Sequence, residues 1–280
     1  MTEQTEAAGT SAVASAETAS FTETVLATKG LTIAFGGHKA VQDVDLEVKE
    51  KSFTSIIGPN GAGKTTLFNL LSGQLKPSFG SIYFKGQDVT RMAPYERTRL
   101  GMGRSFQITN VFPNLSVLEN VRLAVQSRAG VRYNFFSSLH RYRKLEEEAL
   151  GLLELVRLGG KAGALAVQLA HGEKRKLEIA MLLALRAELL LLDEPTAGIS
   201  VEEVPQILEV IRALKQEGSR TIILIEHKME MVLDLSDSIA VLFNGSLLAS
   251  GPPADIMNNE TVQAAYLGGL YDDAAAVGIG

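Results

Sequence analysis

The chain of 280 residues contains no cysteine. It therefore has no disulfide bond, no metal site built on thiolates and no cysteine nucleophile, and it suits a reducing compartment. Basic residues are not in excess either. The chain has 27 Lys and Arg residues and 32 Asp and Glu residues, which gives a net charge of -5. Proteins that bind nucleic acids usually present a basic face, so this balance argues against a nucleic-acid partner.

Long hydrophobic runs are missing as well. A membrane-spanning helix needs about 20 consecutive apolar residues, and the nearest candidate, residues 179–192, is interrupted by Arg186 and Glu188. The start of the chain is rich in Ala, Thr, Ser and Glu, without the basic start and apolar centre of a signal peptide. We interpret residues 1–24 as a disordered tail and expect a soluble protein that reaches a membrane only through a partner.

A glycine-rich stretch carries the strongest positive signal. It has a Gly, four free positions and then Gly-Lys-Thr, which is the pattern of a nucleotide-phosphate loop. Its residues are Gly58, Pro59, Asn60, Gly61, Ala62, Gly63, Lys64, Thr65 and Thr66. The apolar run 53–57 before it predicts a buried strand, and leucines at helical spacing after it predict a helix. A glycine-rich turn capping an ordinary helix is the alternative, and the full context disfavours it.

The residue types of this loop explain its chemistry. Glycines allow backbone conformations in which successive N–H groups point at phosphate oxygens, and a helix N-terminus adds a favourable dipole for an anion. Lys64 is placed to contact the β- and γ-phosphates, and Thr65 to offer a hydroxyl to Mg²⁺. The loop predicts a site for a nucleoside triphosphate.

Two acidic residues and a histidine follow buried strands further along the chain. Asp193 and Glu194 come directly after four leucines, and His227 comes after the apolar run 221–225. In doubly wound sheets, ligands gather at the carboxyl ends of strands. We predict that Asp193 holds Mg²⁺, that Glu194 polarises the attacking water, and that His227 contacts the γ-phosphate or that water. Acids that merely mark the end of a strand are the alternative.

The remaining segments outline the fold. Residues 31–35 and 41–48 predict two strands, and Asn244-Gly245 predicts a hairpin. Residues 116–119 and 200–203 have the form of capping boxes, in which a Ser and a Glu each satisfy a backbone N–H at the start of a helix. The middle third is helical and suggests a subdomain inserted in an α/β core. His38, His140 and His171 have no placement that suggests catalysis.

The order of these motifs resembles that of an ABC-transporter ATP-binding subunit over residues 26–268. The shared features are the phosphate loop, a strand ending in Gln107, the segment 169–173, the Asp-Glu-Pro after four leucines, and His227. Residues 172–180, 128–143 and 265–268 look most like the branched-chain amino-acid uptake branch, and urea-uptake ATPases are similar there.

The resemblance implies an α/β fold: a P-loop NTPase core with a mostly parallel sheet, an N-terminal antiparallel β subdomain and an inserted α-helical subdomain. We expect one ABC ATPase domain at 25–268, with the core at 25–106 and 187–250 and the helical subdomain at 107–186. Residues 269–280 are expected to form a loose tail.

The resemblance also implies that two cassettes enclose two ATP molecules, each between one chain's phosphate loop and the other's signature segment. In this chain the signature residues are Leu169, Ala170, His171, Gly172 and Glu173. By the same match, Phe35 stacks on adenine, although by itself it would be read as core. Gln107 touches Mg²⁺ and links the site to the membrane partner.

Two positions depart from the family pattern. The signature usually has Ser where this chain has Ala170, and the loop after the catalytic strand usually ends in Asp where this chain has Ser200. A lost neutral hydrogen bond weakens a contact by about 0.5–1.5 kcal/mol. We expect the ATP site that uses this chain's signature to be the weaker of the two.

These inferences predict an ATP- and Mg²⁺-dependent ATP hydrolase that powers uptake of branched-chain or other amino acids through a separate permease. Expected partners are an identical or paralogous cassette, integral membrane permease subunits and, indirectly, a solute-binding protein. The expected location is the cytoplasmic face of the cell membrane, peripherally. The alternatives are a urea or amide importer, a non-transport ABC protein acting in translation or DNA repair, and a P-loop kinase or GTPase.

Overall fold

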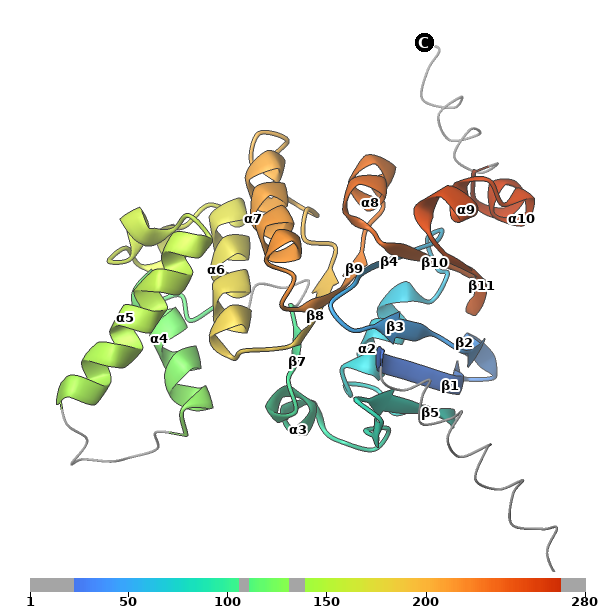
Figure 1. Cartoon of the computed structure of the whole chain (residues 1–280), viewed down its shortest axis with the longest axis horizontal. Coiled ribbons are helices and arrows are strands. Elements are labelled where there is room, and N and C mark those ends of the chain that lie inside the picture. The colour runs from blue at the N-terminus through green and yellow to red at the C-terminus, as the bar shows by residue number, and fades with distance from the viewer. Residues whose placement is uncertain (1–22, 106–110, 131–138, 268–280) are drawn as a thin grey trace, which may run out of the picture.

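The computed structural model describes residues 23–105, 111–130 and 139–267, with two β-sheets as the framework (Figure 1). The larger sheet has the order β11-β10-β4-β9-β8-β7. Its strands are β4 (Phe53–Ile57), β7 (Met102–Arg104), β8 (Leu189–Asp193), β9 (Thr221–Ile225), β10 (Ser238–Phe243) and β11 (Ser246–Gly251). Strands β10, β4, β9, β8 and β7 run parallel, and only β11 is antiparallel to its neighbour. The predicted, mostly parallel α/β sheet is confirmed.

The hairpin between β10 and β11 is confirmed as well. Asn244 and Gly245 join the two strands and both have positive φ angles, 49° and 82°. This is the backbone that a two-residue hairpin turn requires and that Asn-Gly adopts readily.

The second sheet lies at the amino-terminal side and is antiparallel. It contains β1 (Thr24–Phe35), β2 (His38–Val44), β3 (Glu47–Lys49), β5 (Phe79–Phe84) and β6 (Gln87–Asp88). The prediction of one strand over 41–48 is wrong, because the strand is interrupted at residues 45–46, between β2 and β3. The side chain of Thr28 spans the break, accepting from Leu46 N at 2.9 Å and donating to Val44 O at 2.8 Å. Burial of Val44, Leu46 and Val48 continues across the break, so apolar alternation alone did not reveal it.

The helices divide into those that follow sheet strands and those of the middle third. They are α2 (Lys64–Leu71), α3 (Pro94–Arg99), α4 (Val117–Arg128), α5 (Leu139–Leu155), α6 (His171–Ala184), α7 (Val204–Glu217), α8 (Met229–Leu235), α9 (Pro253–Met257) and α10 (Glu260–Val262). Short turns of other helix types lie at Gly159–Lys161, Ala166–Gln168 and Gln263–Leu267.

Neither of the two predicted capping boxes forms completely in the structure. Ser116 caps α4 by accepting from Glu119 N at 3.1 Å, but the Glu119 carboxylate pairs with Arg122 instead of closing the box. Ser200 caps nothing, because α7 begins only at Val204. A helix beginning at residue 201 would place Pro205 in its interior, where proline removes a backbone hydrogen bond. The later start leaves Pro205 in the first turn, where it is tolerated.

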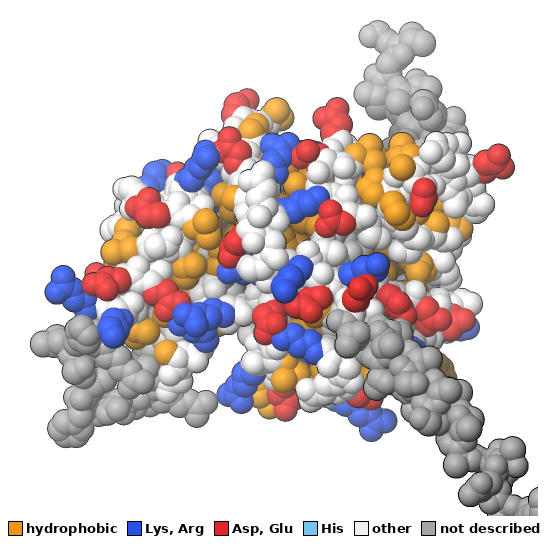
Figure 2. Space-filling model, viewed as in Figure 1, with side chains coloured by type: hydrophobic (Ala, Val, Ile, Leu, Met, Phe, Trp, Pro, Cys, Tyr) orange, Lys and Arg blue, Asp and Glu red, His pale blue; other side chains and the backbone are white. Residues whose placement is uncertain are grey.

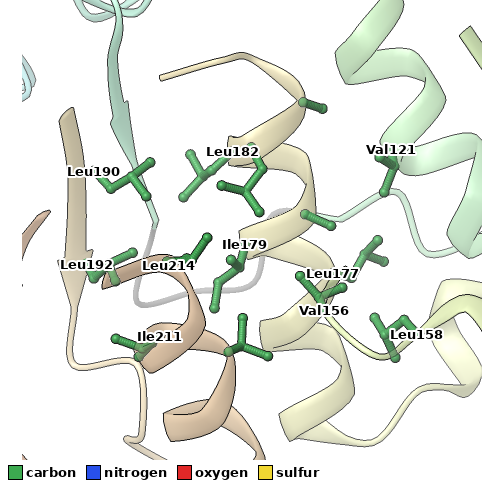
Figure 3. Packing of buried hydrophobic residues seen from close by; sticks show 14 of the residues in the cluster. Val121, Val156, Leu158, Leu177, Ile179, Leu182, Leu190, Leu192, Ile211 and Leu214 are labelled. Atoms are coloured by element: carbon green, nitrogen blue, oxygen red, sulfur yellow. The ribbon is translucent and has the colours of Figure 1, made fainter. Parts of the chain in front are cut away.

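The larger sheet is buried on both faces. Alternate residues of β8 belong to different hydrophobic clusters: Leu189 and Leu191 face α2 and the antiparallel sheet, whereas Leu190 and Leu192 face the helices of the other side. Figure 3 shows the second cluster, in which side chains of β8, α6 and α7 meet. Because β8 and β9 are covered on both sides, their sequences are almost continuously apolar rather than alternating.

No helix among the described residues is long and apolar enough to cross a bilayer. On the face shown in Figure 2, acidic and basic side chains are interspersed.

Candidate functional site

Three parallel strands end side by side at one edge of the larger sheet. Strand β4 pairs with β9, and β9 pairs with β8. The glycine loop 58–63 follows β4, Asp193 is the last residue of β8, and Glu226 and His227 follow β9. The parallel pairing therefore collects polar groups that are far apart in the sequence at a single edge.

The glycine loop needs its glycines at two positions of close approach. A Cβ on Gly58 would lie 2.2 Å from Leu242 O, and a Cβ on Gly63 would lie 2.4 Å from Ala40 O. Gly63, the residue before α2, also has a φ of 97°. The loop is thus packed against the β10–β11 hairpin and the start of β2, and Ala62 O accepts from Gly245 N at 3.1 Å.

Lys64 opens α2 and lies inside the loop. Its ammonium donates to Gly58 O at 2.7 Å and to Pro59 O at 3.0 Å, and the residue is only 6% exposed. Burial lowers the pKa of Lys64, while the charges of Glu194 and Asp193 oppose this effect. A buried cation is thus held by loop carbonyl groups, within the electrostatic influence of two carboxylates.

Asp193 is held by an arginine that the sequence analysis did not single out. Arg104, the last residue of β7, donates to Asp193 Oδ2 at 2.9 Å. The same guanidinium donates to Asn69 Oδ1 at 2.7 Å and Ser72 Oγ at 2.8 Å, so it joins β8 to α2. Burial raises the pKa of Asp193, and the Arg104 guanidinium opposes that rise. The Arg104 contacts give this carboxylate a defined orientation.

Glu194 and His227 lie in direct contact. His227 Nε2 is 2.7 Å from Glu194 Oε1, and the two side chains are 40% and 21% exposed. Glu194 has a φ of 43°, which is uncommon for a residue with a side chain. Its N–H donates to Ile225 O at 3.0 Å, which ties the end of β8 to the end of β9.

A pocket of about 220 Å³ opens between these groups. It is lined by His38, Ala40, Asn60, Gly61, Ala62, Gly63, Lys64, Thr65, Thr66, Glu194 and His227. The structure therefore brings the loop, the second carboxylate and the strand-end histidine into one cavity. His38 was given no role from the sequence, and the turn that follows β1 places it at the rim.

Other predicted residues lie elsewhere or outside the described part of the chain. Phe35 ends β1 and is 51% exposed, three residues before His38, but it is not part of the pocket lining. Residues 169–173 form the start of α6, with Ala170 and His171 exposed, and they do not line the pocket either. Gln107 lies outside the described residues.

The site residues also include groups whose sequence signal was weak. Neither Arg104 nor Glu226 belongs to a recognisable sequence motif: Arg104 lies three residues before Gln107, and Glu226 lies directly before His227. Only their burial and partners reveal them, since Glu226 is 3% exposed and bonded to Thr196. A charged residue at the end of a buried strand or directly after it was the one available hint.

The donor set fits a hard divalent cation. Thr65 supplies a hydroxyl at the pocket wall, and Asp193, which does not line the pocket, supplies an oriented carboxylate whose charge acts on Lys64. Mg²⁺ at nucleotide sites takes one or two protein oxygens and completes its shell with phosphate oxygens and water. These two residues are compatible with that arrangement.

Comparisons with known proteins agree with this geometry. The family model described as ABC transporter matches residues 41–197, and the model described as branched-chain amino acid ATP-binding cassette transporter matches residues 246–272. The chain is 39% identical over 251 residues to the high-affinity branched-chain amino acid transport ATP-binding protein LivG of Salmonella typhimurium, covering 87% of this chain and 98% of the relative. A probable LivG of Archaeoglobus fulgidus is 38% identical over 248 residues, covering 87% and 95%.

Solved structures show the same architecture. The chain is similar to an ATP-binding cassette of an ABC transporter in its ADP conformation, with a TM-score of 0.74, 29% identity, and 88% and 100% of the two chains covered. It is also similar to a dimeric cassette in a post-hydrolysis state bound to ADP and Pi, with a TM-score of 0.68, 26% identity, and 81% and 98% covered. With its glycine loop, strand-end carboxylates and two-sheet fold, the chain belongs to the ABC transporter family and is an ABC-type ATPase.

Proposed function

We propose that this ATPase powers an importer for branched-chain or other amino acids, acting through a separate permease. The observation that carries the proposal is the match along nearly the whole chain to relatives named for branched-chain amino acid transport, together with the C-terminal match at 246–272. The same names leave the urea or amide alternative less favoured. The fold and the matched family likewise disfavour a kinase or GTPase.

ATP phosphates bind in the pocket at the glycine loop. The loop N–H groups and the start of α2 face the triphosphate, and the Lys64 ammonium exchanges its two loop carbonyls for phosphate oxygens. Thr65 and Asp193 hold Mg²⁺, which neutralises phosphate charge when it is bound. Arg104 keeps the Asp193 carboxylate oriented for this role.

Glu194 and His227 carry the hydrolytic step. Glu194 accepts the proton of a water that attacks the γ-phosphorus in line, and His227 orients the same carboxylate and contacts the γ-phosphate. The contact of 2.7 Å between Glu194 and His227 supports this pairing. The positive φ of Glu194 turns its side chain back toward the glycine loop, where it lines the pocket.

The start of α6 serves the ATP of a second cassette. Gly172 lies in its first turn, and residues 170 and 171 are exposed to a partner. Phe35 stacks on adenine from the rim, and Gln107 reports the γ-phosphate to the permease. The partner cassette is identical or paralogous, and the dimer sits at the cytoplasmic face of the membrane against integral membrane subunits. We assign the core to 25–106 and 187–250 and the helical subdomain to 107–186.

Replacing Glu194 by Gln tests the chemistry. The amide keeps the size of the side chain but cannot accept the proton, so turnover falls about 100-fold or more. ATP binding, followed with a fluorescent ATP analogue, stays within about twofold because the phosphate-binding groups remain. The exposed Glu47 of β3 provides the control, and Glu47→Gln leaves both quantities unchanged. Parental turnover in Glu194→Gln would contradict the assigned role.

Copurification tests the transport role. A tagged chain expressed in its own host retains integral membrane subunits, and ATPase activity of that complex rises when a binding protein loaded with a branched-chain amino acid is added. Stimulation by urea-loaded protein alone would select the alternative. Recovery with ribosomes or DNA in place of membrane subunits would refute the transport assignment.

A further inference from the structure

Glu226 is a buried carboxylate to which no role in ATP binding or hydrolysis has been given so far. It directly follows β9 and is 3% exposed. Its Oε1 accepts from the Thr196 hydroxyl at 2.6 Å, and its Oε2 accepts from the N–H of His227 at 3.0 Å and of Lys228 at 3.4 Å. One carboxylate therefore receives hydrogen bonds from two separate loops.

These two loops carry the hydrolytic pair. Thr196 follows Glu194 by two residues in the loop after β8, and it is 5% exposed. His227 is the next residue after Glu226 in the loop after β9. The hydrogen bonds that Glu226 accepts thus connect the backbone at His227 to the loop that carries Glu194.

The geometry of the pair depends on this connection. Both side chains are partly exposed, at 21% for Glu194 and 40% for His227, so surrounding packing holds them less firmly than the core. Their contact of 2.7 Å requires the two loops to keep their spacing. A backbone bond from the N–H of Glu194 to the carbonyl of Ile225, the residue before Glu226, ties the same two loops.

We propose that Glu226 is a positioning residue that, through Thr196, sets the distance between Glu194 and His227. Glu226 does not line the nucleotide pocket, so it acts on the hydrolytic step and not on ATP binding. The inference rests on the proposed roles of Glu194 and His227. It goes beyond them because it makes a residue outside the pocket responsible for their alignment.

Three variants of the full-length chain, assayed in its copurified transporter complex, test the inference. Glu226→Ala removes every bond to both loops, and because small misplacements of catalytic groups are costly, kcat falls about tenfold or more. The Kd for the fluorescent ATP analogue stays within about twofold, because the glycine loop and Lys64 are untouched.

Glu226→Gln is the conservative control. Its amide oxygen accepts from the His227 N–H and its NH₂ donates to the Thr196 hydroxyl, which can accept as well as donate. It therefore keeps the connection and most of the parental kcat. Thr196→Val cuts the connection on one side only and lowers kcat by less than Glu226→Ala does. Thermal unfolding of each variant identifies any that does not fold.

The outcomes separate this inference from the proposed function. Parental kcat in Glu226→Ala, or a loss in Glu226→Gln as large as in Glu226→Ala, overturns the positioning role. If Glu226→Ala does not fold, a parental kcat in Thr196→Val overturns it instead. A Glu194→Gln variant measured alongside tests the proposed function separately. If Glu194→Gln loses turnover while the Glu226 and Thr196 variants keep the parental kcat, the positioning role is refuted and the proposed function stands.

Discussion

Two helix N-termini of this chain, those of α2 and α6, have very different surroundings. The start of α2 follows Gly63, and its first residue, Lys64, is buried in a pocket that also contains Glu194 and His227. The start of α6 is exposed at Ala170, whose N–H donates to the Glu173 carboxylate at 3.2 Å. The first N-terminus lies in a pocket lined by residues from several elements of the chain, whereas the second begins at an exposed residue whose N–H is bonded by a side chain of the same helix.

This difference shows which of the two helix N-termini belongs to a site that one chain forms without a partner. At α2, parallel strands bring the cation, the carboxylates and the histidine together without help from another molecule. At α6, residues 169–173 do not reach that pocket, which agrees with the proposal that they act on nucleotide bound by a second cassette. Changes near α2 should therefore affect the isolated chain, and changes near α6 only the assembled transporter.

The largest effect is expected from Arg104→Met. The Arg104–Asp193 pair is buried, with side chains 8% and 2% exposed, so removing one partner leaves a buried charge and lowers the free energy of unfolding by about 3–5 kcal/mol. Urea unfolding of the isolated chain measures this loss. Arg104→Lys should recover part of it, since the charge stays while the fork to Asn69 and Ser72 is lost. The exposed Arg186, changed to Met, is the control with no measurable loss.

Lys64→Ala should have the next largest effect, on nucleotide binding. A hydrogen bond to a charged group contributes about 1.5–3 kcal/mol, so the Kd for ATP rises roughly 10- to 100-fold. Titration of the isolated chain with a fluorescent ATP analogue detects this change. The exposed Lys76, changed to Ala, should bind as the parent does. An unchanged Kd in Lys64→Ala would place the triphosphate somewhere other than this pocket.

A pair of glycine substitutions should separate backbone strain from close packing in the loop. Gly61 and Gly63 both have positive φ, 79° and 97°, but only a Cβ on Gly63 meets another atom, Ala40 O at 2.4 Å. A left-handed backbone costs a residue with a side chain about 1–2 kcal/mol. Gly63→Ala should therefore lose more stability and more ATP affinity than Gly61→Ala. Equal losses would mean that contact with Ala40 does not matter.

Ala170→Ser should have the smallest effect and should appear only at the α6 site. The added hydroxyl supplies one neutral hydrogen bond of about 0.5–1.5 kcal/mol to a partner's γ-phosphate. ATPase activity of the assembled complex should rise by up to about tenfold, because RT ln 10 is near 1.4 kcal/mol. The isolated chain should bind ATP as before. A changed ATP affinity of the isolated chain would contradict the proposal that only the N-terminus of α6 acts on the nucleotide of a partner.

The local pattern of apolar residues correctly predicted those strands near the site that are fully buried. Strands β8 and β9 are covered on both faces, so their apolar runs were recognisable, and β4 was recognisable from Phe53, Ile56 and Ile57. The pattern was wrong where contacts with distant residues decide. Thr28 breaks the predicted strand 41–48 by bonding Val44 and Leu46, and Pro205 delays the start of α7.

The glycine loop, the strand-end acids and the histidine were recognisable from the sequence, because backbone freedom, charge and strand burial are properties of residues and their near neighbours. Tertiary structure alone decided that Arg104 holds Asp193 and that Glu226 joins the loops of Glu194 and His227. The Arg104–Asp193 and Thr196–Glu226 contacts link residues 89 and 30 positions apart. Only the order in which the parallel strands pair brings such residues together, because pairing and not chain distance sets which strand ends are neighbours.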